Sequence, residues 1–471
     1  MNMDKRFCAK FKNGLILYRA MLQPSKEMRS QKGKMGPPMN RSQTRTTIRD
    51  FGPLGVPAFL GMWNWEFGAL FQRNILNHNT RRARWCPIVV PTLDMKIRAF
   101  LTGVMIVLSP LALLAATAST NSAATPSLEA IRKKYDLPAL ALIVVKDGTI
   151  CERDAVGVRK LGDPTPVTTN DVFHIGSCTK SMTATLAAIL IEQGKLRWNT
   201  TIAEVFPELK GKMDKQYENV TVEQLLEHIG GVPGEPPTLA WLQAWAEKGT
   251  STEQRREFIE AVLSKPPAAA PGTKMIYSNQ GYAIVGAMLE KITGRDYESL
   301  ITEKLFKPLH MDTAGFGFPG TAGKIDQPWG HVERLWKTIP VQEDNPPAIS
   351  PAGRVHCSLD DLAKFAMFHL QPGTNGLLKA ETVTRLHTPP KGVKIETPAD
   401  NYACGWVVLR RPWSGGTTLW HNGSNTMWYI VMWLAPKKNF AVIAATNKAG
   451  TQAESACDDA ATAMIFKWLP N

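Results

Sequence analysis

Cysteine is scarce in this chain, and the few cysteines present do not fall into pairs. There are 7 among 471 residues. The cysteines after residue 118 are Cys151, Cys178, Cys357, Cys404 and Cys457. Their number is odd and no two form a C-x-x-C motif, which argues against a disulfide scaffold and against a zinc site. The sequence alone does not decide whether two of these cysteines form a single disulfide, because it does not show which cysteines lie close together. We expect no metal and no cofactor.

The main body of the chain also lacks a charge imbalance. The whole sequence has 55 basic and 41 acidic residues and a formal net charge of +14. Residues 1–94 hold 16 of the basic and 5 of the acidic residues, and residues 95–118 add 2 basic ones. This leaves 37 basic and 36 acidic residues in 119–471, a net charge of only +1. The main body therefore gives no reason to expect a nucleic-acid partner.

Residues 95–118 have the pattern of a secretory signal. A short basic start (95–98, Met-Lys-Ile-Arg) precedes an apolar run from 99 to 116, and residues 116–118 read Ala-Thr-Ala, an A-x-A cleavage signature. We expect export, to the periplasm or the medium, with removal of the signal. Retention of this segment as a membrane anchor is the alternative, and the run is long enough for it.

The Arg-rich residues 1–94 show no hydrophobic periodicity that would build a core. Two interpretations stay open. In the first, translation starts at Met95 and residues 1–94 are not translated. In the second, residues 1–94 are a basic cytoplasmic arm before an anchor helix, as the positive-inside rule would allow. In both cases the functional domain is residues 119–471.

The hydrophobic pattern along this domain predicts an α+β fold. Opening strands, a helical middle and closing strands indicate one antiparallel sheet built from both chain ends, flanked by helices and holding a helical insertion. We place the sheet parts at about 125–172 and 348–471 and the helical part at about 173–345. The expected strands are 139–146, a second strand to about 158, 402–410, 417–421, 427–435 and 440–446. The expected helices include one after Ser177 and the segments 222–226, 253–264, 282–293 and 453–468.

Ser177 and Lys180 carry the strongest chemical signal. Three positions apart on one helix, they would project from the same face. A serine hydroxyl needs a base to become a good nucleophile, and a lysine in a partly dry pocket can serve as that base. Residues 181–192 are nearly free of charge and Gly194 follows, which predicts a buried helix with a glycine stop. The spacing alone is weak, because S-x-x-K strings also occur by chance.

Two further motifs follow in the chain. Tyr277 and Asn279 form a Y-x-N motif 100 residues after Ser177, and His421 and Gly423 form an H-x-G motif a further 144 residues on. Taken singly, they read as a core tyrosine and a strand-end histidine. In this order, however, the three motifs resemble the serine β-lactamase and penicillin-binding-protein superfamily. The resemblance is greatest to its class C-like branch, which includes D-Ala-D-Ala carboxypeptidases, D-stereospecific aminopeptidases and esterases.

The resemblance extends over roughly residues 127–470. Beyond the three motifs, it includes segments 225–228, 271–282, 306–311, 351–353 and 359–362. It implies a β-lactamase/transpeptidase-like fold and acyl transfer without a metal. Ser177 would attack a carbonyl while Lys180, aided by the Tyr277 phenolate or hydroxyl, takes the proton. Tyr277 would then protonate the leaving group.

The remaining positions would bind substrate. Asn279 would orient the lysine and bind a substrate amide. The backbone N–H groups of Ser177 and Ser424 would form an oxyanion hole, and Gly423 would leave room along the strand edge. His421 stands where β-lactamases usually carry a lysine for the carboxylate of the antibiotic, so the pattern favours esterase and peptidase members.

Three other residues bear on this interpretation. Met427 occupies a position where relatives often have glycine, and we expect a bulkier, more apolar rim there. His228 and His356 match no motif position, so we expect structural roles for both.

We therefore expect a secreted serine hydrolase acting through an acyl-enzyme on an ester, a D-amino-acid peptide or a β-lactam-like amide. A catalytically silent peptidoglycan- or ligand-binding protein of the same fold and a true class C-like β-lactamase are the alternatives. The expected partner is a small-molecule or peptide substrate, with a membrane only if 95–118 is retained as an anchor. The sequence does not give the oligomeric state.

Overall fold

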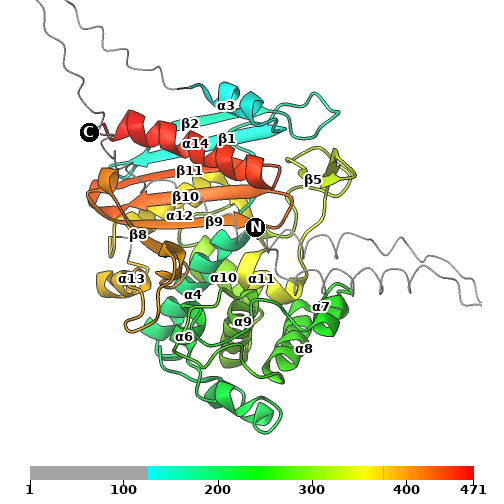
Figure 1. The fold of residues 1–471 in the computed structure, drawn as a ribbon, viewed down its shortest axis with the longest axis vertical. Helices are drawn as coiled ribbons and strands as arrows, with labels where there is room; N and C mark the ends of the chain where they lie inside the picture. Colours follow the sequence, from blue (N-terminus) through cyan, green and yellow to red (C-terminus); the bar gives the residue numbers. More distant parts are fainter. Residues whose placement is uncertain (1–125, 375, 471) are drawn as a thin grey trace, which may run out of the picture. The chain divides into compact units, whose positions relative to one another are not determined.

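A six-stranded antiparallel sheet forms the centre of the structure, a computed structural model that describes residues 126–374 and 376–470. Its strands, in sheet order, are β2 (Thr149–Gly157), β1 (Ala139–Lys146), β11 (Phe440–Thr446), β10 (Tyr429–Ala435), β9 (Gly416–Ser424) and β8 (Val407–Arg411). Two come from the start of the domain and four from its end (Figure 1). The predicted α+β fold, with a sheet built from both chain ends, is confirmed. The expectations for 1–94 and 95–118 lie outside the described residues.

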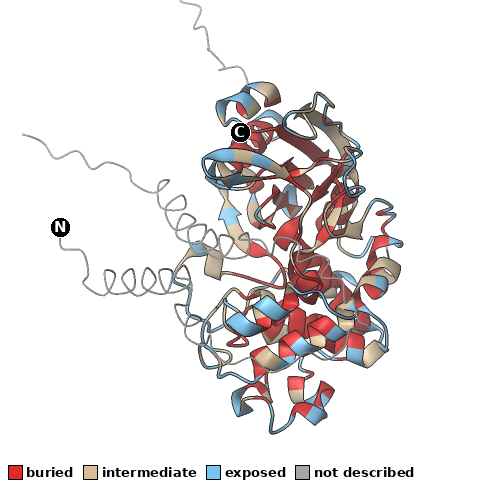
Figure 2. Cartoon of the chain, turned by 90° about the vertical axis from the view of Figure 1, so that its right-hand side faces the viewer, coloured by how far each residue is buried: buried red, intermediate tan, exposed pale blue. Residues whose placement is uncertain are grey.

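Both faces of this sheet are covered by helices. Alternate residues of β1 point to opposite sides, so that Ile143 packs into one hydrophobic cluster and Leu142 into the other. The helices α3 (Leu128–Lys134) and α14 (Thr451–Trp468) cover one face. On the other face lie α12 (Leu359–Leu370) and the helical part of the domain. Figure 2 shows the buried residues concentrated in the sheet and in the helices beside it. This double coverage explains why β1 reads as a continuous apolar run.

The helical part lies between the two sheet-forming regions. Its helices are α4 (Thr179–Glu192), α5 (Ile202–Val205), α6 (Val222–Leu226), α7 (Thr238–Ala244), α8 (Ser251–Leu263), α9 (Asn279–Thr293) and α10 (Tyr297–Ile301). Two more, α11 (Ser350–Gly353) and α13 (Ala380–Leu386), follow later in the chain. The predicted helices at 222–226, 253–264, 282–293 and 453–468 correspond to α6, α8, α9 and α14. Gly194, the predicted stop of α4, has a left-handed φ of 70°.

Short helical turns connect these elements. They are η1 (Gly176–Cys178), η2 (Pro207–Leu209), η3 (Lys215–Tyr217), η4 (Thr302–Phe306), η5 (Pro347–Ile349), η6 (Pro398–Asp400), η7 (Pro412–Ser414) and η8 (Pro436–Lys438). Of these, η1 holds the predicted nucleophile, and β9 packs against it.

Strands also occur where we expected helical structure. The small sheet β3 (Val172–His174), β7 (Val355–Ser358) and β4 (Gly315–Phe316) has its last strand inside the segment 173–345. The hairpin β5 (Gly330–Arg334) and β6 (Lys337–Val341) lies there too. The prediction missed the hairpin because its two-residue turn is Leu335-Trp336. Both residues have positive φ, 49° and 65°, in positions that glycine, asparagine and aspartate normally fill.

The strand predicted for 402–410 begins only at Val407. Gly405, with a φ of 84°, turns the chain just before it, and a Cβ there would lie 2.4 Å from Ser181 Cα on α4. The preceding residues therefore form a loop against α4, and this loop carries Tyr402 into the site described below.

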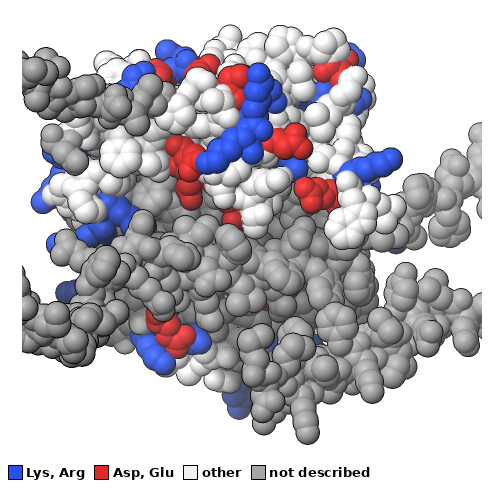
Figure 3. Space-filling view, turned by 45° about the horizontal axis from the view of Figure 1, so that its top comes forward, with Lys and Arg blue, Asp and Glu red and all other residues white. Residues whose placement is uncertain are grey.

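Basic and acidic side chains are interspersed on the part of the face that Figure 3 draws in colour, in line with the nearly balanced composition of 119–471. Within residues 126–374 and 376–470, none of the helices has both the length and the apolar character required to span a bilayer. The cysteines of this region, Cys151, Cys178, Cys357, Cys404 and Cys457, are free thiols.

Candidate active site

Ser177 lies in η1, directly before the first turn of α4. No side chain caps the start of α4, so the N–H groups of its first turn are left for other partners, and the positive end of the helix dipole faces this region. The preceding residue, Gly176, has a φ of 48°, and a Cβ on it would lie 2.3 Å from Ser424 N. Glycine is therefore required for η1 to approach the end of β9 this closely.

Lys180 is fully buried on α4, one turn after the serine. Its Nζ lies 3.0 Å from Ser177 Oγ, 2.7 Å from Asn279 Oδ1 and 2.9 Å from the carbonyl oxygen of Ala352. The last two atoms can only accept, so two N–H bonds of the amine point to them. Burial holds the pKa of Lys180 well below its usual value. In the neutral amine the third direction, toward Ser177, holds the lone pair that can take the hydroxyl proton.

Tyr277 and Asn279 enter the site from the start of α9. Ser278 caps this helix by accepting a hydrogen bond from Gly281 N at 3.2 Å, which fixes the residues on either side of it. Burial raises the pKa of Tyr277, and a hydrogen bond with Ser177 opposes that shift. The sequence did not decide whether Tyr277 acts as a phenolate or as a neutral hydroxyl. This environment favours the neutral hydroxyl, a form that can donate a proton.

The last residues of β9 approach Ser177 from the other side. A Cβ on Gly423 would lie 2.0 Å from the carbonyl oxygen of Ile175 and 2.8 Å from Ser177 N, so only glycine fits. Strand β8 pairs with β9 only as far as Trp420. The edge formed by residues 421–424 therefore faces η1 rather than a neighbouring strand, and the backbone N–H groups of Ser177 and Ser424 belong to two segments in contact.

His421, on the same edge, is held in one tautomer. Its Nδ1 contacts the carbonyl oxygen of Asn422, which can only accept, so the ring proton is on Nδ1. Its Nε2 lies 2.9 Å from the hydroxyl of Tyr402 and must accept from it. Burial, with a contribution from nearby Lys180, lowers the pKa of His421 to about 3. The ring is thus neutral, and its second nitrogen is already occupied.

The predicted site residues Ser177, Lys180, Tyr277, Asn279, His421, Gly423 and Ser424 therefore lie together around one serine hydroxyl. The sequence did not single out Tyr402 or the carbonyl of Ala352. Tyr402 fell within a segment predicted as a strand, and a backbone carbonyl carries no sequence signal of its own.

The two histidines for which we expected structural roles, His228 and His356, differ in their position. His228 packs against Tyr277 and Tyr402, with ring centres 4.4 and 4.7 Å apart, and its Nδ1 accepts from Ser278 N. Burial places its pKa well below the usual value, so it is a neutral packing residue beside the site. His356 lies on β7, where its Nδ1 is 2.9 Å from the carbonyl oxygen of Gly317.

The expectation that Met427 forms an apolar rim is wrong. Its side chain is only 4% exposed and belongs to the hydrophobic core. It packs against the base of the β5–β6 hairpin, where a Cβ on Gly330 would lie 2.7 Å from Met427 Cβ. Cys178, between Ser177 and Lys180 in the sequence, is buried. Burial raises the pKa of its thiol, so it does not compete with Ser177 as a nucleophile.

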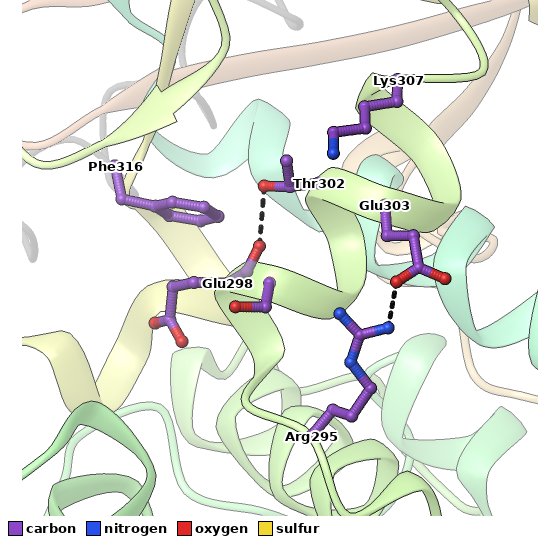
Figure 4. Close-up of a pocket in the computed structure, with 7 residues that line it drawn as sticks. Arg295, Glu298, Thr302, Glu303, Lys307 and Phe316 are labelled. Carbon is purple, nitrogen blue, oxygen red and sulfur yellow. Dashed lines mark hydrogen bonds and ion pairs between the residues drawn. The ribbon is translucent and has the colours of Figure 1, made fainter.

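A cavity of about 400 Å³ lies apart from these residues, around α10 and η4 (Figure 4). Among its lining residues, Arg295 pairs with Glu303 and the Thr302 hydroxyl donates to the carbonyl of Glu298. No member of the seven-residue cluster around Ser177 lines this cavity. In the described part of the chain, no group of three or more His, Cys, Asp or Glu side chains is arranged to hold a metal ion.

The chain is similar to known proteins of one family. The family model for Beta-lactamase matches residues 125–463. Penicillin-binding protein 4 of Amycolatopsis lactamdurans is 27% identical over 329 residues, which cover 68% of this chain and 83% of that protein. Protein flp of Staphylococcus aureus is 22% identical (67% and 60% covered), and the unguisins hydrolase ungD' of Aspergillus campestris is 26% identical (67% and 59% covered). The chain thus spans about 60% of the length of the last two.

Solved structures show the same fold. The octameric penicillin-binding protein homologue from Pyrococcus abyssi superposes with a TM-score of 0.60 at 23% identity, covering 73% of this chain and 78% of that one. SurE gives a TM-score of 0.59 at 23% identity, with 73% and 74% covered. With the family model matching well over half of its length, the chain belongs to the Beta-lactamase family, within the serine β-lactamase and penicillin-binding-protein-like superfamily of serine hydrolases.

Proposed function

We propose that this protein hydrolyses esters, or amides of D-amino acids, whose leaving part carries no carboxylate. The reaction begins when the neutral amine of Lys180 takes the Ser177 hydroxyl proton as Oγ attacks the carbonyl carbon. The backbone N–H groups of Ser177 and Ser424 bind the negative charge that develops on the carbonyl oxygen. The Tyr277 hydroxyl then gives its proton to the leaving oxygen or nitrogen, and the Lys180 ammonium restores that proton.

The resulting acyl-enzyme is an ester on Ser177 Oγ. Water attacks its carbonyl carbon and gives its proton to Lys180 by way of Tyr277. Collapse of the second tetrahedral intermediate breaks the bond to Oγ, which takes the proton back. The acid product leaves, and the hydroxyl, phenol and amine regain their starting protonation states.

The neutral state of His421 carries the substrate assignment. A carboxylate next to the scissile bond would need a cation on this strand edge, and the residue there is an imidazole whose Nε2 already accepts from Tyr402. A carboxylate placed beside it would lose its hydration without gaining an ion pair, which is costly in a buried site. An ester or amide with a neutral leaving part avoids this cost. The name of one relative, an unguisins hydrolase, supports hydrolysis as the reaction class.

The site argues against the two alternatives. A silent binding protein has no use for a buried lysine whose Nζ lies 3.0 Å from a serine hydroxyl, an arrangement that is costly to maintain without a function. An efficient β-lactamase would need to recognise the carboxylate of the antibiotic.

Rates with three substrates test this assignment: p-nitrophenyl butyrate, a peptide ending in D-Ala-D-Ala, and nitrocefin. We expect kcat/KM for the ester to exceed the values for both carboxylate-bearing substrates at least about 100-fold, since a lost charged contact costs roughly 3 kcal/mol. His421→Lys should narrow this ratio at least tenfold. Equal rates on all three substrates would contradict the assignment.

We further propose that the protein is exported and cleaved after Ala118. The pattern of residues 95–118 supports this, together with the absence of charge in the run 99–116. Mass spectrometry of the N-terminal peptide from cell fractions should find Ser119 as the first residue of an extracytoplasmic form. Peptides from residues 1–94 in that form would contradict it.

A further inference from the structure

A buried carboxylate, Asp344, lies behind the two segments that carry the backbone N–H groups of Ser177 and Ser424. It is in the loop between β6 and η5, and its side chain is only 3% exposed. No sequence motif includes it. Three side chains from different parts of the chain face its carboxylate: those of His174, Arg354 and Asn425.

His174 connects Asp344 to the nucleophile. The ring is fully buried at the end of β3, and its Nδ1 accepts a hydrogen bond from Gly176 N at 3.1 Å. An accepting Nδ1 carries no proton, so the ring proton is on Nε2. This Nε2 lies 2.9 Å from Asp344 Oδ1. Asp344 thereby fixes the tautomer and orientation of the ring that holds the backbone N–H directly before Ser177.

Asn425 connects the same carboxylate to the opposite segment. This residue directly follows Ser424 and is only 1% exposed. Its Nδ2 donates to Asp344 Oδ1 at 3.1 Å, while its Oδ1 accepts from the backbone N–H groups of Met427 and Trp428, both at 3.2 Å. The amide therefore holds the turn after β9 together and ties that turn to Asp344.

Asp344 is charged in this environment. Burial alone would raise its pKa, but His174, Arg354 and Asn425 together outweigh burial and hold the pKa of Asp344 below its usual value. Arg354 Nε donates to Oδ2 at 3.2 Å, and the backbone N–H of Asn345 donates to Oδ1 at 2.7 Å. A carboxylate with this many donors has a fixed position, and the groups bonded to it are fixed with it.

We propose that Asp344 is a positioning residue that sets the separation of the two N–H groups of the oxyanion hole. It acts through His174 on the Ser177 segment and through Asn425 on the Ser424 segment. Such donors help only when they lie about 2.7–3.1 Å from the developing oxyanion, so small displacements reduce catalysis. The contact is stronger in the transition state than with bound substrate, so its loss lowers kcat more than it raises KM. This inference rests on the proposed function.

The test compares Asp344→Asn with Asp361→Asn. Asp361 is also a buried carboxylate, with its side chain 4% exposed, and it accepts several hydrogen bonds, from Thr313 and Lys364, but none of its partners belongs to the site. With p-nitrophenyl butyrate we expect Asp344→Asn to lower kcat about 10- to 100-fold with KM changed less than about threefold, somewhat less than the loss of a whole oxyanion donor. The folded fraction of Asp361→Asn should keep kcat within about twofold of the wild-type value, even if its melting temperature falls as much as that of Asp344→Asn.

Inhibition by a phenylboronic acid gives a second readout. This compound forms a tetrahedral adduct with a serine hydroxyl and places an oxygen in the oxyanion hole. Its inhibition constant should rise in Asp344→Asn by about the factor lost in kcat/KM, and stay unchanged in Asp361→Asn. If Asp344→Asn does not fold, Asn425→Ala removes one of the two connections and should show the same pattern more weakly.

Suppose that the wild-type protein is active. Equal losses of kcat in the two aspartate variants, or an unchanged inhibition constant in Asp344→Asn, would then overturn this inference and leave the proposed function standing. Wild-type protein without esterase activity would overturn the proposed function, and this inference with it.

Discussion

In the proposed mechanism Lys180 is the base, and its surroundings suit this role because they exclude water and accept two of its N–H bonds at carbonyl oxygens. Burial disfavours the ammonium form and lowers the pKa of Lys180, so the neutral amine is available at a lower pH than in an exposed lysine. The carbonyl of Ala352 and the amide of Asn279 then direct the remaining position toward Ser177. The nucleophile and its base are thus oriented before substrate binds.

The pH dependence of kcat/KM should report this base. Only neutral Lys180 can take the serine proton, so the rate should rise with pH through the lowered pKa of Lys180, well below the ordinary value of 10.5. Lys180→Arg should lower kcat/KM at least about 1000-fold at every pH, because a guanidinium stays protonated. A rising limb near pH 10.5, or an active arginine variant, would show that Lys180 is not the base.

Gly423 has no room for a side chain. Gly423→Ala would place a methyl group 2.0 Å from the carbonyl oxygen of Ile175 and force β9 away from Ser177. We expect kcat/KM to fall at least about 100-fold, as for loss of an oxyanion donor. Gly281→Ala is the matched control: its Cβ would find only ordinary contacts at 3.6 Å and beyond, inside α9. Full activity of Gly423→Ala in a p-nitrophenyl ester assay would exclude the close approach described here.

Residue-level prediction from sequence worked where local geometry decides the contact. Ser177 and Lys180 are one helical turn apart, so their spacing alone brings them together. Tyr402 was missed because its contact with His421 depends on the loop that Gly405 turns back against α4. Asp344 was missed for the same reason, since its partners come from β3 and from the turn after β9.

At the level of elements, the β5–β6 hairpin keeps an unfavourable turn. Leu335 and Trp336 are 91% and 102% exposed and both adopt left-handed backbone conformations. A non-glycine residue in this region costs about 1–2 kcal/mol. The cost of two such residues explains why the pattern of the sequence did not predict a hairpin. The strands β10 and β11, in contrast, are nearly continuous apolar runs that are buried on both faces, with a turn at 436–439 between them, and both were predicted.

Replacing the turn by Leu335→Asn and Trp336→Gly should therefore stabilise the protein. Asn-Gly is the favoured pair for a two-residue turn with positive φ at both positions. We expect the free energy of unfolding to rise by about 1 kcal/mol, because the relief of strain exceeds the entropy cost of the added glycine. Leu335→Ala with Trp336→Ala keeps the strain and should give no gain. Thermal melts followed by circular dichroism measure the stability of both variants. A melting temperature of the Asn-Gly variant below that of the wild type would contradict the turn geometry.

For the whole molecule, burial of neutral histidines predicts sensitivity to acid. The pKa values lowered by burial are those of His228, His331, His356, His369, His387 and His421, with His331 at about 4 and His387 and His421 at about 3. Below pH 6.5 the unfolded chain binds protons at these positions that the folded protein does not, so acid favours unfolding. Each such proton changes stability by about 1.4 kcal/mol per pH unit.

Four buried carboxyl groups act in the opposite direction. Burial raises the pKa of Glu227 to about 8 and that of Asp458 to about 6, and it also raises the pKa values of Glu290 and Glu454. Folding therefore keeps protons there that the unfolded chain releases. The histidines outnumber these groups, and we expect the free energy of unfolding to fall by several kcal/mol between pH 7 and pH 5. Urea unfolding at the two pH values measures this. Equal stability at both would show that these histidines are not buried in neutral form.

Strands from both ends of the domain form the sheet that supports the site. Strand β1 pairs with β11, so the start of the domain supports the strands that present His421, Gly423 and Ser424 to the nucleophile. The order of strand and helix segments in the sequence predicted this arrangement. Its exact register was not predictable, because pairing between residues about 300 positions apart, such as Ala141 and Ala445, leaves no local signal.

The central claim is that Ser177 is a nucleophile activated by the residues around it. Reaction of the wild-type protein with a fluorophosphonate, followed by intact-mass measurement and peptide mapping, tests it most directly. We expect one adduct per chain, on the peptide that contains Ser177, with no adduct in Ser177→Ala and labelling slowed at least about 1000-fold in Lys180→Arg. A folded wild-type protein that stays unmodified, or an adduct on any other residue, would contradict the account.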